Sequence, residues 1–325
     1  MNESLPGSDY VLHPEIAEMV RQSRTAQMSG PGTHDAAELR RRKAERMAKL
    51  GPISDVAAIR DVRIQNGETA VSARIYVPHR FVDGVIVYYH GGGWVTGTLD
   101  DYNVLCQSLA DASGAMVMSV DYRLAPEHPF PAALEDAMAA LRWTARHIGK
   151  SRPLVILGDS AGGNLAAAAA GTISRSELQI ALQVLVCPVL DHDFDTGSYK
   201  EFGEGFVLSR SDMEWYWDQY IPDQSLRNDP LASPLRATDL TGLSPSLLVL
   251  AGCDPLRDEG LRYAARLDQA GVPVQVTVFS DVVHGFFPLA PRLERANDAV
   301  RLIGAAVREA CTLGISSSKN GDFAG

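Results

Sequence analysis

One serine in this sequence stands between glycines in a pattern that suits nucleophilic catalysis. Ser160 lies in the pentapeptide Gly158-Asp159-Ser160-Ala161-Gly162, which follows an aliphatic stretch and precedes an alanine-rich one. A Gly-x-Ser-x-Gly elbow turns the chain sharply from a strand into a helix and exposes the serine hydroxyl at the end of the strand. The outer glycines allow strand and helix to approach closely. The pentapeptide also occurs in ordinary turns, but this context predicts a nucleophile.

A serine hydroxyl is a weak nucleophile at neutral pH and needs a base within hydrogen-bond distance. In folds that contain this elbow, the partners follow in the order serine, acid, histidine. Of the eight histidines, only His192 and His284 come after Ser160. His284 directly follows an apolar segment, whereas His192 lies in an aspartate-rich segment. We therefore predict that His284 is the base.

The acid is expected at the end of another strand. Asp254 directly follows an apolar segment, and Pro255 would end that strand and leave Asp254 at its carboxyl end. Asp258 and Glu259 are alternatives, but both fall at the start of the next expected helix, where acidic residues commonly meet the helix dipole. The sequence favours Asp254.

Backbone amides for an oxyanion are predicted next to the segment His-Gly-Gly-Gly-Trp, residues 90–94. Glycines leave N–H groups accessible to a substrate, so we expect Gly91 and Gly92 to donate from one side and Ala161 from the other. A nucleotide-binding loop is excluded because the glycine spacing is not Gly-x-Gly-x-x-Gly and no Walker lysine follows.

The substrate pocket is harder to assign from sequence. We expect contributions from Trp94, Asp159, Phe206 and Trp215. The aromatic segment 209–220 is expected to be a helix, and its rings suit either packing or a binding wall. The charged segment 121–127 is expected to brace the active-site loops.

These residues need a framework of alternating strands and helices. Apolar segments rich in valine and isoleucine predict eight strands at residues 57–64, 73–77, 85–89, 115–120, 154–157, 180–186, 247–250 and 274–279. Helical patterns predict helices at residues 13–29, 35–50, 101–112, 131–147, 164–173 and 260–270. From the third segment onward the strands are almost continuously hydrophobic, which is typical of a mostly parallel sheet covered on both faces. We expect the first two strands to pair as an antiparallel hairpin through the Asn-Gly turn.

This pattern divides the chain into a core and a cap. We expect an α/β core at residues 53–190 and 243–314, cap helices at residues 1–52, a second cap segment at residues 191–242 and a disordered tail at residues 315–325. An interval of about fifty residues after the sixth strand is too long for an unstructured loop.

Composition narrows the class of protein. The 325 residues have a formal charge of −10, which disfavours nucleic acid and anionic membranes as partners. The four cysteines are widely spaced, which argues against a disulfide framework or a zinc site. No apolar stretch is long enough to span a bilayer and no secretory signal begins the chain, so we expect a cytoplasmic protein. The basic segment 40–50 is interpreted as the water-facing side of a helix.

Five motifs in order resemble the bacterial hormone-sensitive-lipase-like esterases, family IV of the α/β hydrolases: HGGGW at 90–94, YRLAPE at 122–127, GDSAGGN at 158–164, DPLRDEG at 254–260 and HGF at 284–286. The resemblance implies an eight-stranded α/β-hydrolase sheet, a helical cap and no cofactor. It also implies that Ser160, Asp254 and His284 form a catalytic triad. At position 94 the family often has phenylalanine instead of tryptophan.

The expected function is hydrolysis of short to medium acyl esters through an acyl-enzyme, with a small-molecule ester as the partner. Because members of the family that this chain resembles often form dimers, a homodimer is one expected oligomeric state. An amidase, a carbamate hydrolase or a lactonase would use the same residues, since the leaving group is recognised by the cap. A small-molecule receptor of this fold would not need an intact triad, and a lipid-binding lipase would use its N-terminal helices at an interface.

Overall fold

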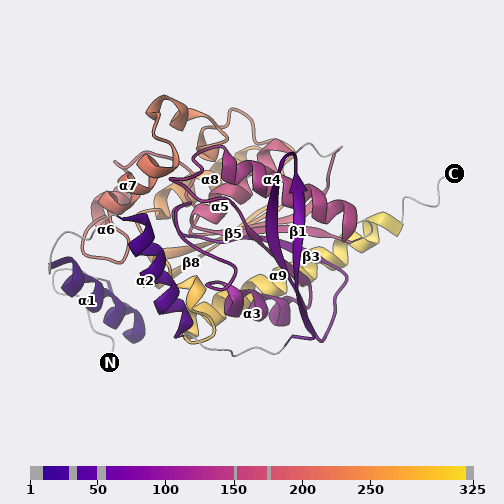
Figure 1. Ribbon diagram of the computed structural model, residues 1–325, viewed down its shortest axis with the longest axis horizontal. Coiled ribbons are helices and arrows are strands. Elements are labelled where there is room, and N and C mark those ends of the chain that lie inside the picture. Colours follow the sequence, from indigo (N-terminus) through magenta and orange to yellow (C-terminus); the bar gives the residue numbers. More distant parts are fainter. Residues whose placement is uncertain (1–9, 29–34, 50–55, 150–151, 174–176, 320–325) are drawn as a thin grey trace.

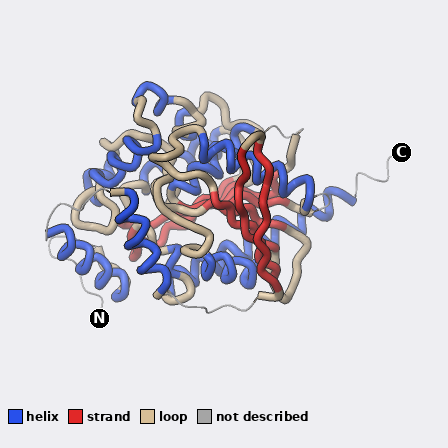
Figure 2. Tube along the Cα trace, in the orientation of Figure 1, coloured by secondary structure: helices blue, strands red, loops and turns tan. Residues whose placement is uncertain are grey.

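The computed structural model describes residues 10–28, 35–49, 56–149, 152–173 and 177–319 (Figure 1). Within these residues the chain forms a twisted sheet with helices on both sides, as Figure 2 shows. The eight-stranded, mostly parallel sheet expected from the sequence is confirmed.

The sheet has the order β1-β2-β4-β3-β5-β6-β7-β8. Its strands are β1 (Ala58–Asn66), β2 (Thr69–Val77), β3 (Val85–Tyr89), β4 (Met116–Asp121), β5 (Leu154–Asp159), β6 (Ile180–Val186), β7 (Ser246–Cys253) and β8 (Val274–Val283). Strands β3 to β8 run parallel to one another, while β2 is antiparallel to both β1 and β4. Because parallel strands end at the same edge, the segments after β3, β5, β7 and β8 meet there.

The first two strands form the antiparallel hairpin predicted at the sheet edge. Asn66 pairs with Thr69 across the turn, and Gly67 has a φ of +59°, a conformation that glycine adopts without strain.

Helices cover both faces of the sheet and divide the core into two layers. On one face lie α4 (Ala132–His147), α5 (Ala161–Thr172) and α8 (Arg257–Gln269). On the other lie α3 (Asn103–Ser113) and α9 (Glu294–Lys319), which pack against each other (Figure 1). Strands β3, β5 and β7 are buried along their whole length, which explains their continuous hydrophobicity, whereas the edge strand β8 is buried only at its end.

Helix α9 was not among the helices expected from the sequence. Its buried residues Ala296, Ala299, Ile303, Val307 and Cys311 recur at intervals of three or four, which is the signal that would have identified it. The helix continues to Lys319, so residues 315–319 are helical instead of beginning the disordered tail expected at residue 315. The last six residues of that tail lie outside the described residues.

Four helices gather at one end of the sheet: α1 (Pro14–Met28), α2 (Ala36–Ala48), α6 (Gly197–Phe202) and α7 (Arg210–Tyr220) (Figure 1). The long interval after β6 thus has structure of its own, including two short 3₁₀ helices at Gln224–Asn228 and Pro234–Arg236. The aromatic helix predicted at residues 209–220 is α7. In the part of the chain that is described, no helix combines the length and the apolar character needed to cross a bilayer.

Candidate active site

The serine elbow joins β5 to α5 with almost no space between them. Ser160 has φ 55° and ψ −121°, and its N–H donates to the Val186 carbonyl oxygen at 2.8 Å. A Cβ at Gly158 would lie 2.1 Å from the Gly162 carbonyl oxygen, and one at Gly162 would lie 2.0 Å from the Tyr89 carbonyl oxygen. Both outer positions of the pentapeptide therefore require glycine, for the reason inferred from the sequence.

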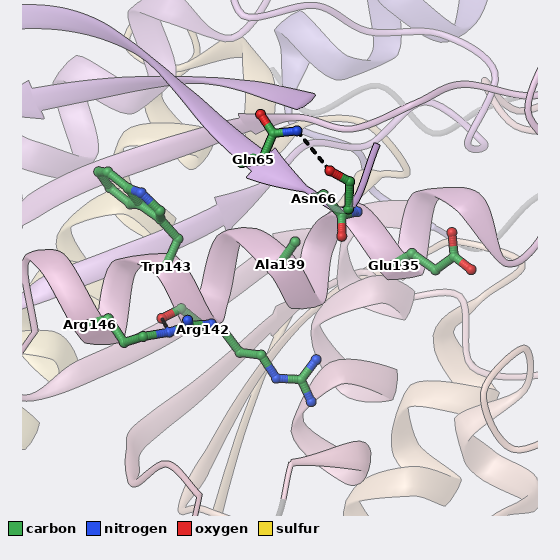
Figure 3. Close-up of a pocket in the computed structure, with 8 residues that line it drawn as sticks. Gln65, Asn66, Glu135, Ala139, Arg142, Trp143 and Arg146 are labelled. Carbon is green, nitrogen blue, oxygen red and sulfur yellow. Dashed lines mark hydrogen bonds between the residues drawn. The ribbon is translucent and has the colours of Figure 1, made fainter. Parts of the chain in front are cut away.

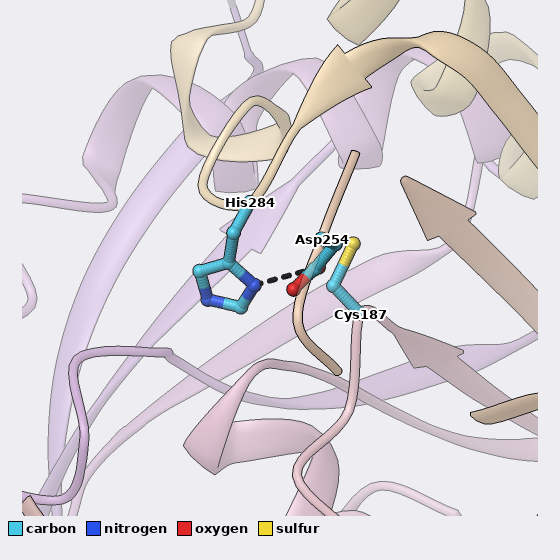
Figure 4. Close-up of side chains that lie close together, drawn as sticks. All are labelled: Cys187, Asp254 and His284. Carbon is cyan, nitrogen blue, oxygen red and sulfur yellow. Dashed lines mark hydrogen bonds and ion pairs between the residues drawn. The ribbon is translucent and has the colours of Figure 1, made fainter. Parts of the chain in front are cut away.

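The structure brings together the three side chains predicted to act in a relay. The Nε2 atom of His284 lies 3.0 Å from Ser160 Oγ, and its Nδ1 atom lies 2.8 Å from Asp254 Oδ2. Ser160 follows β5, Asp254 follows β7 and His284 follows β8, so three strand ends at one edge of the sheet supply the set. Figure 4 shows the His284 ring pointing its Nδ1 atom at the carboxylate.

The surroundings of His284 favour its role as a base. Burial opposes the charged imidazolium, but the Asp254 carboxylate outweighs burial and raises the pKa of His284 above its ordinary value of 6.5, with Asp159 contributing in the same direction. Asp254 itself is almost fully buried, and its Oδ1 atom accepts the N–H of Leu256 at 2.9 Å. Both carboxylate oxygens are thus held in place.

The alternatives weighed in the sequence have other partners. Asp258 Oδ2 accepts the Ser198 N–H at 2.8 Å, and Glu259 Oε2 accepts the Asp191 N–H at 2.9 Å, so both acids hold the segment after β6. His192 lies 3.3 Å from the Ser233 hydroxyl and packs against Trp217.

The glycine loop, which we define as residues 90–94 after β3, does not leave Gly91 free as the predicted oxyanion donor. The Gly91 N–H donates to Asp159 Oδ1 at 3.0 Å and is therefore not available to an oxyanion. Within the described residues, the N–H groups of Gly92, Gly93 and Ala161 have no recorded protein partner. Ala161 is the first residue of α5, where N–H groups have no intrahelical acceptor.

Gly93 is a candidate donor that the sequence reasoning missed. Gly92 has φ +129° and Gly93 has φ +61°, both in the region that favours glycine. A Cβ at Gly93 would lie 2.2 Å from the ring of Tyr216 on α7, so this position also needs the missing side chain. The third consecutive glycine was the available signal.

Asp159 is buried beside the glycine loop and binds its backbone, so it does not line a substrate pocket. Its buried carboxylate accepts the Tyr88 hydroxyl at 2.5 Å as well as the Gly91 N–H. Burial raises the pKa of Asp159, while these donors and the nearby Lys43 ammonium oppose that shift. The pocket role expected for Asp159 is therefore replaced by a positioning role.

The other predicted pocket residues are also largely enclosed. Trp94 is fully buried, with its ring stacked on Tyr220 at 4.2 Å, so in this conformation it presents no surface to a substrate. Phe206 is buried against Phe202, and Trp215 is half-buried and remains a candidate. The packing interpretation of the aromatic helix applies to Trp217 and Tyr220.

The charged segment after β4 braces the loop, as the sequence predicted. The Tyr122 hydroxyl donates to the His90 carbonyl oxygen at 2.7 Å, and the His90 ring is stacked between Tyr102 and Tyr122. Arg123 donates to the buried carboxylate of Asp136 on α4. Burial lowers the pKa of His90 to about 3, so this histidine is neutral.

Cys187 lies beside the relay, as Figure 4 shows. Potential metal-ligating atoms of Cys187, Asp254 and His284 all lie within 4.8 Å of one another. Burial raises the pKa of the Cys187 thiol well above its ordinary value, so the sulfur is protonated and a weak metal ligand. The other two groups are already bonded to each other, and this donor set suits a proton relay better than a metal.

A surface hollow lies away from these residues, between the β1–β2 turn and α4 (Figure 3). It is lined by Gln65, Asn66, Gly67, Glu135, Ala139, Arg142, Trp143 and Arg146. None of these residues belongs to the relay or to the glycine loop.

Known proteins resemble this chain over most of its length. Residues 86–288 match the family described as the alpha/beta hydrolase fold. An ethyl acetate hydrolase of Pseudomonas putida is 34% identical over 92% of this chain and 99% of the relative, and an arylesterase of Saccharolobus solfataricus is 32% identical over 92% and 98%. The solved structure of a hyperthermophilic esterase from Pyrobaculum calidifontis has a TM-score of 0.85 at 36% identity, covering 92% of this chain and 98% of that chain.

Proposed function

This chain belongs to the hormone-sensitive-lipase-like esterase family of the α/β hydrolases, and we propose that Ser160, His284 and Asp254 carry its carboxylic ester hydrolysis. The observation that carries the proposal is the continuous relay from the Ser160 hydroxyl through the imidazole to the Asp254 carboxylate, with contacts of 3.0 and 2.8 Å. The contact between Ser160 Oγ and His284 Nε2 permits proton transfer in both directions, while the Asp254 carboxylate stays ionised and holds the imidazole in place.

Acylation begins when Ser160 Oγ attacks the ester carbonyl carbon while His284 Nε2 takes the hydroxyl proton. The carbonyl π pair moves to oxygen and forms a tetrahedral oxyanion. When that intermediate collapses, the bond to the leaving alcohol breaks and His284 delivers its proton to the alcohol oxygen. Water then attacks the acyl carbon while His284 takes its proton. The bond to Ser160 Oγ breaks, His284 returns the proton to Oγ, and the carboxylic acid leaves.

The oxyanion is assigned to the N–H groups of Gly92, Gly93 and Ala161. Amides already in place when charge develops stabilise the transition state without reorganisation, and removing one such donor typically lowers turnover about 10²- to 10³-fold. Among the described residues no protein acceptor binds these three N–H groups, which supports the assignment.

Asp254 is assigned to orient the imidazole. Its bond to Nδ1 fixes the tautomer that leaves Nε2 free to accept the Ser160 proton, and its charge stabilises the imidazolium formed in the reaction. The raised pKa of His284 reflects the same attraction.

The helices α1 and α2, together with residues 191–242, are assigned as a cap that limits the acyl chain. Three observations support this: α2 contacts the glycine loop, Tyr216 of α7 lies against Gly93, and Trp94 stacks on Tyr220. We expect short to medium acyl chains, and the name of the relative that hydrolyses ethyl acetate supports short ones.

The direct test combines labelling with a substrate series. A fluorophosphonate probe should label wild-type protein at Ser160, and p-nitrophenyl esters of increasing acyl length should be hydrolysed with a maximum at short to medium chains. Matched esters and amides of one acid measure leaving-group preference, with faster ester cleavage expected. An unlabelled, inactive protein would point instead to a small-molecule receptor.

A further inference from the structure

Lys43 of α2 turns away from water, unlike Arg41 and Arg42 directly before it in the basic segment 40–50. Arg41 and Arg42 are exposed and pair with glutamates of their own helix, as the sequence predicted for a water-facing side. Lys43 is partly buried, and its ammonium group reaches the loop that follows β3. The water-facing interpretation is therefore wrong for Lys43.

The Lys43 ammonium binds the first glycine of that loop. Its Nζ atom donates to the Gly91 carbonyl oxygen at 3.0 Å and to the Tyr102 hydroxyl at 3.0 Å, and it lies 3.5 Å from Thr96 Oγ1. Tyr102 in turn donates to the same Gly91 carbonyl oxygen at 2.8 Å. Asp159 accepts the Gly91 N–H from the other side, so both polar groups of this glycine are fixed.

Because the peptide unit is planar, fixing the Gly91 carbonyl also fixes the direction of the Gly92 N–H. The Gly91 carbonyl and the Gly92 N–H belong to one planar peptide unit, and in a trans unit they point in opposite directions. Holding the carbonyl toward Lys43 therefore directs the Gly92 N–H away from Lys43. A cation on the carbonyl also polarises the unit and makes its N–H a stronger donor.

A second residue of α2 keeps the helix against the same loop. Arg40, one turn before Lys43, donates to the carbonyl oxygens of Val95 at 2.8 Å and Ala125 at 2.9 Å, and it pairs with Glu127. These contacts fix α2 against the loop, so the Lys43 ammonium is held at the Gly91 carbonyl by the position of the helix as well as by its own side chain.

We propose that Lys43 is a positioning residue of the oxyanion site: by binding the Gly91 carbonyl it orients and polarises the Gly92 N–H for the transition state. This inference rests on the proposed function. It gives α2 a part in turnover that is separate from acyl-chain selection.

The Lys43 ammonium should lose its charge as the pH rises through about 8. Burial lowers its pKa to about 8, while the carboxylates of Asp159 and Asp101 favour the charged form and Arg46 opposes it. The other titratable groups that face it are neutral near pH 8, because burial lowers the pKa of His90 and raises that of Tyr102. Deprotonation above pH 8 should therefore weaken the polarisation of Gly92.

The test compares Lys43→Met with Arg41→Met, which removes a charge from the exposed side of the same helix. With a short p-nitrophenyl ester, Lys43→Met should lower kcat about tenfold, less than the loss of a whole oxyanion donor, and change KM less than twofold. Its affinity for a trifluoromethyl ketone, which forms an oxyanion adduct with serine, should fall by the same factor. Arg41→Met should retain wild-type values.

Two further variants separate positioning from stability. Lys43→Gln keeps N–H donors without the charge, so it should retain more activity than Lys43→Met. It should also lack the decline in kcat that we expect for wild type above pH 8. If Lys43→Met does not fold by circular dichroism, Tyr102→Phe removes one partner of the same carbonyl and should lower kcat in the same direction.

The possible outcomes distinguish this inference from the proposed function. A wild type that hydrolyses esters and a folded Lys43→Met with unchanged kcat and ketone affinity would overturn the role of Lys43 alone. A change confined to KM would also overturn it, because it would indicate substrate binding. A wild type without hydrolysis or labelling would overturn the proposed function and this inference with it.

Discussion

The two sides of the proposed active site are held by different parts of the molecule. Ser160, Asp254 and His284 each follow a strand of the parallel sheet, and their spacing is set by the strands themselves. The glycine loop opposite follows β3 but is held by side chains from elsewhere, including Asp159 at the end of β5 and Lys43 on α2. The first side depends on the sheet and the second on contacts between distant segments.

Because of this difference, substitutions on the two sides should affect turnover by different amounts. Changes on the relay side remove reacting or orienting groups, so they should have large effects on turnover and little effect on folding. Changes around the glycine loop leave every reacting group present and alter only the direction or strength of an amide donor. Their effects should be smaller and should appear mainly in kcat.

The largest effect is expected for Ser160→Ala. Loss of the nucleophile should lower kcat by about 10⁴- to 10⁶-fold, and the remaining rate would come from the oxyanion amides and binding. The melting temperature should stay close to wild type, since alanine fits the same backbone. Initial rates with p-nitrophenyl butyrate measure the loss, with Ser225→Ala as an exposed-serine control. A near-wild-type rate would show that another residue is the nucleophile.

The next largest effect is expected for Asp254→Asn, and comparison with Asp258→Asn shows which of the two acids after β7 orients the imidazole. Asp254→Asn should lower kcat about 10⁴-fold because the amide favours the wrong imidazole tautomer. Asp258→Asn should change kcat only slightly, since Asp258 binds the Ser198 N–H and not His284. Equal losses in the two variants, measured with the same ester, would contradict the assignment of Asp254.

The pH dependence of kcat/KM tests the state of His284. A base must be neutral to accept a proton, so activity should be low below its pKa and rise as pH increases through it. Because Asp254 raises this pKa, the half-maximal rate should lie above pH 6.5. Initial rates between pH 5 and 8 would reveal the rise, and a flat profile would rule out titration of His284.

The smallest effect is expected on the loop side, for Asp159→Asn. Loss of the charge should weaken the bond to the Gly91 N–H and lower kcat about three- to tenfold, in line with a net hydrogen-bond contribution of about 1 kcal/mol. The acid limb of the pH profile should shift to lower pH, because Asp159 contributes to the raised pKa of His284. Asp111→Asn on the exposed side of α3 is the control. An unchanged limb would remove Asp159 from this electrostatic role.

The sequence alone determined much of the sheet and the residues at its edge. Apolar segments flanked by turn residues predicted all eight strands. The pattern was strongest for β3, β5 and β7, because a parallel strand buried on both faces must be hydrophobic throughout. The order of the motifs then selected Asp254 and His284 over their neighbours. The strand predictions are confirmed, because strands are set by local hydrophobic pattern, whereas the roles of Asp254 and His284 stay a proposal.

Only the tertiary structure decided which glycine amide is bonded within the protein and which side chains hold the glycine loop. The sequence could not show that Asp159 accepts the Gly91 N–H or that Lys43 leaves the water-facing side of its helix, because both depend on contacts between residues 48 or more positions apart. The direction of an N–H group in a glycine loop follows from such contacts, since glycine itself restricts the backbone least.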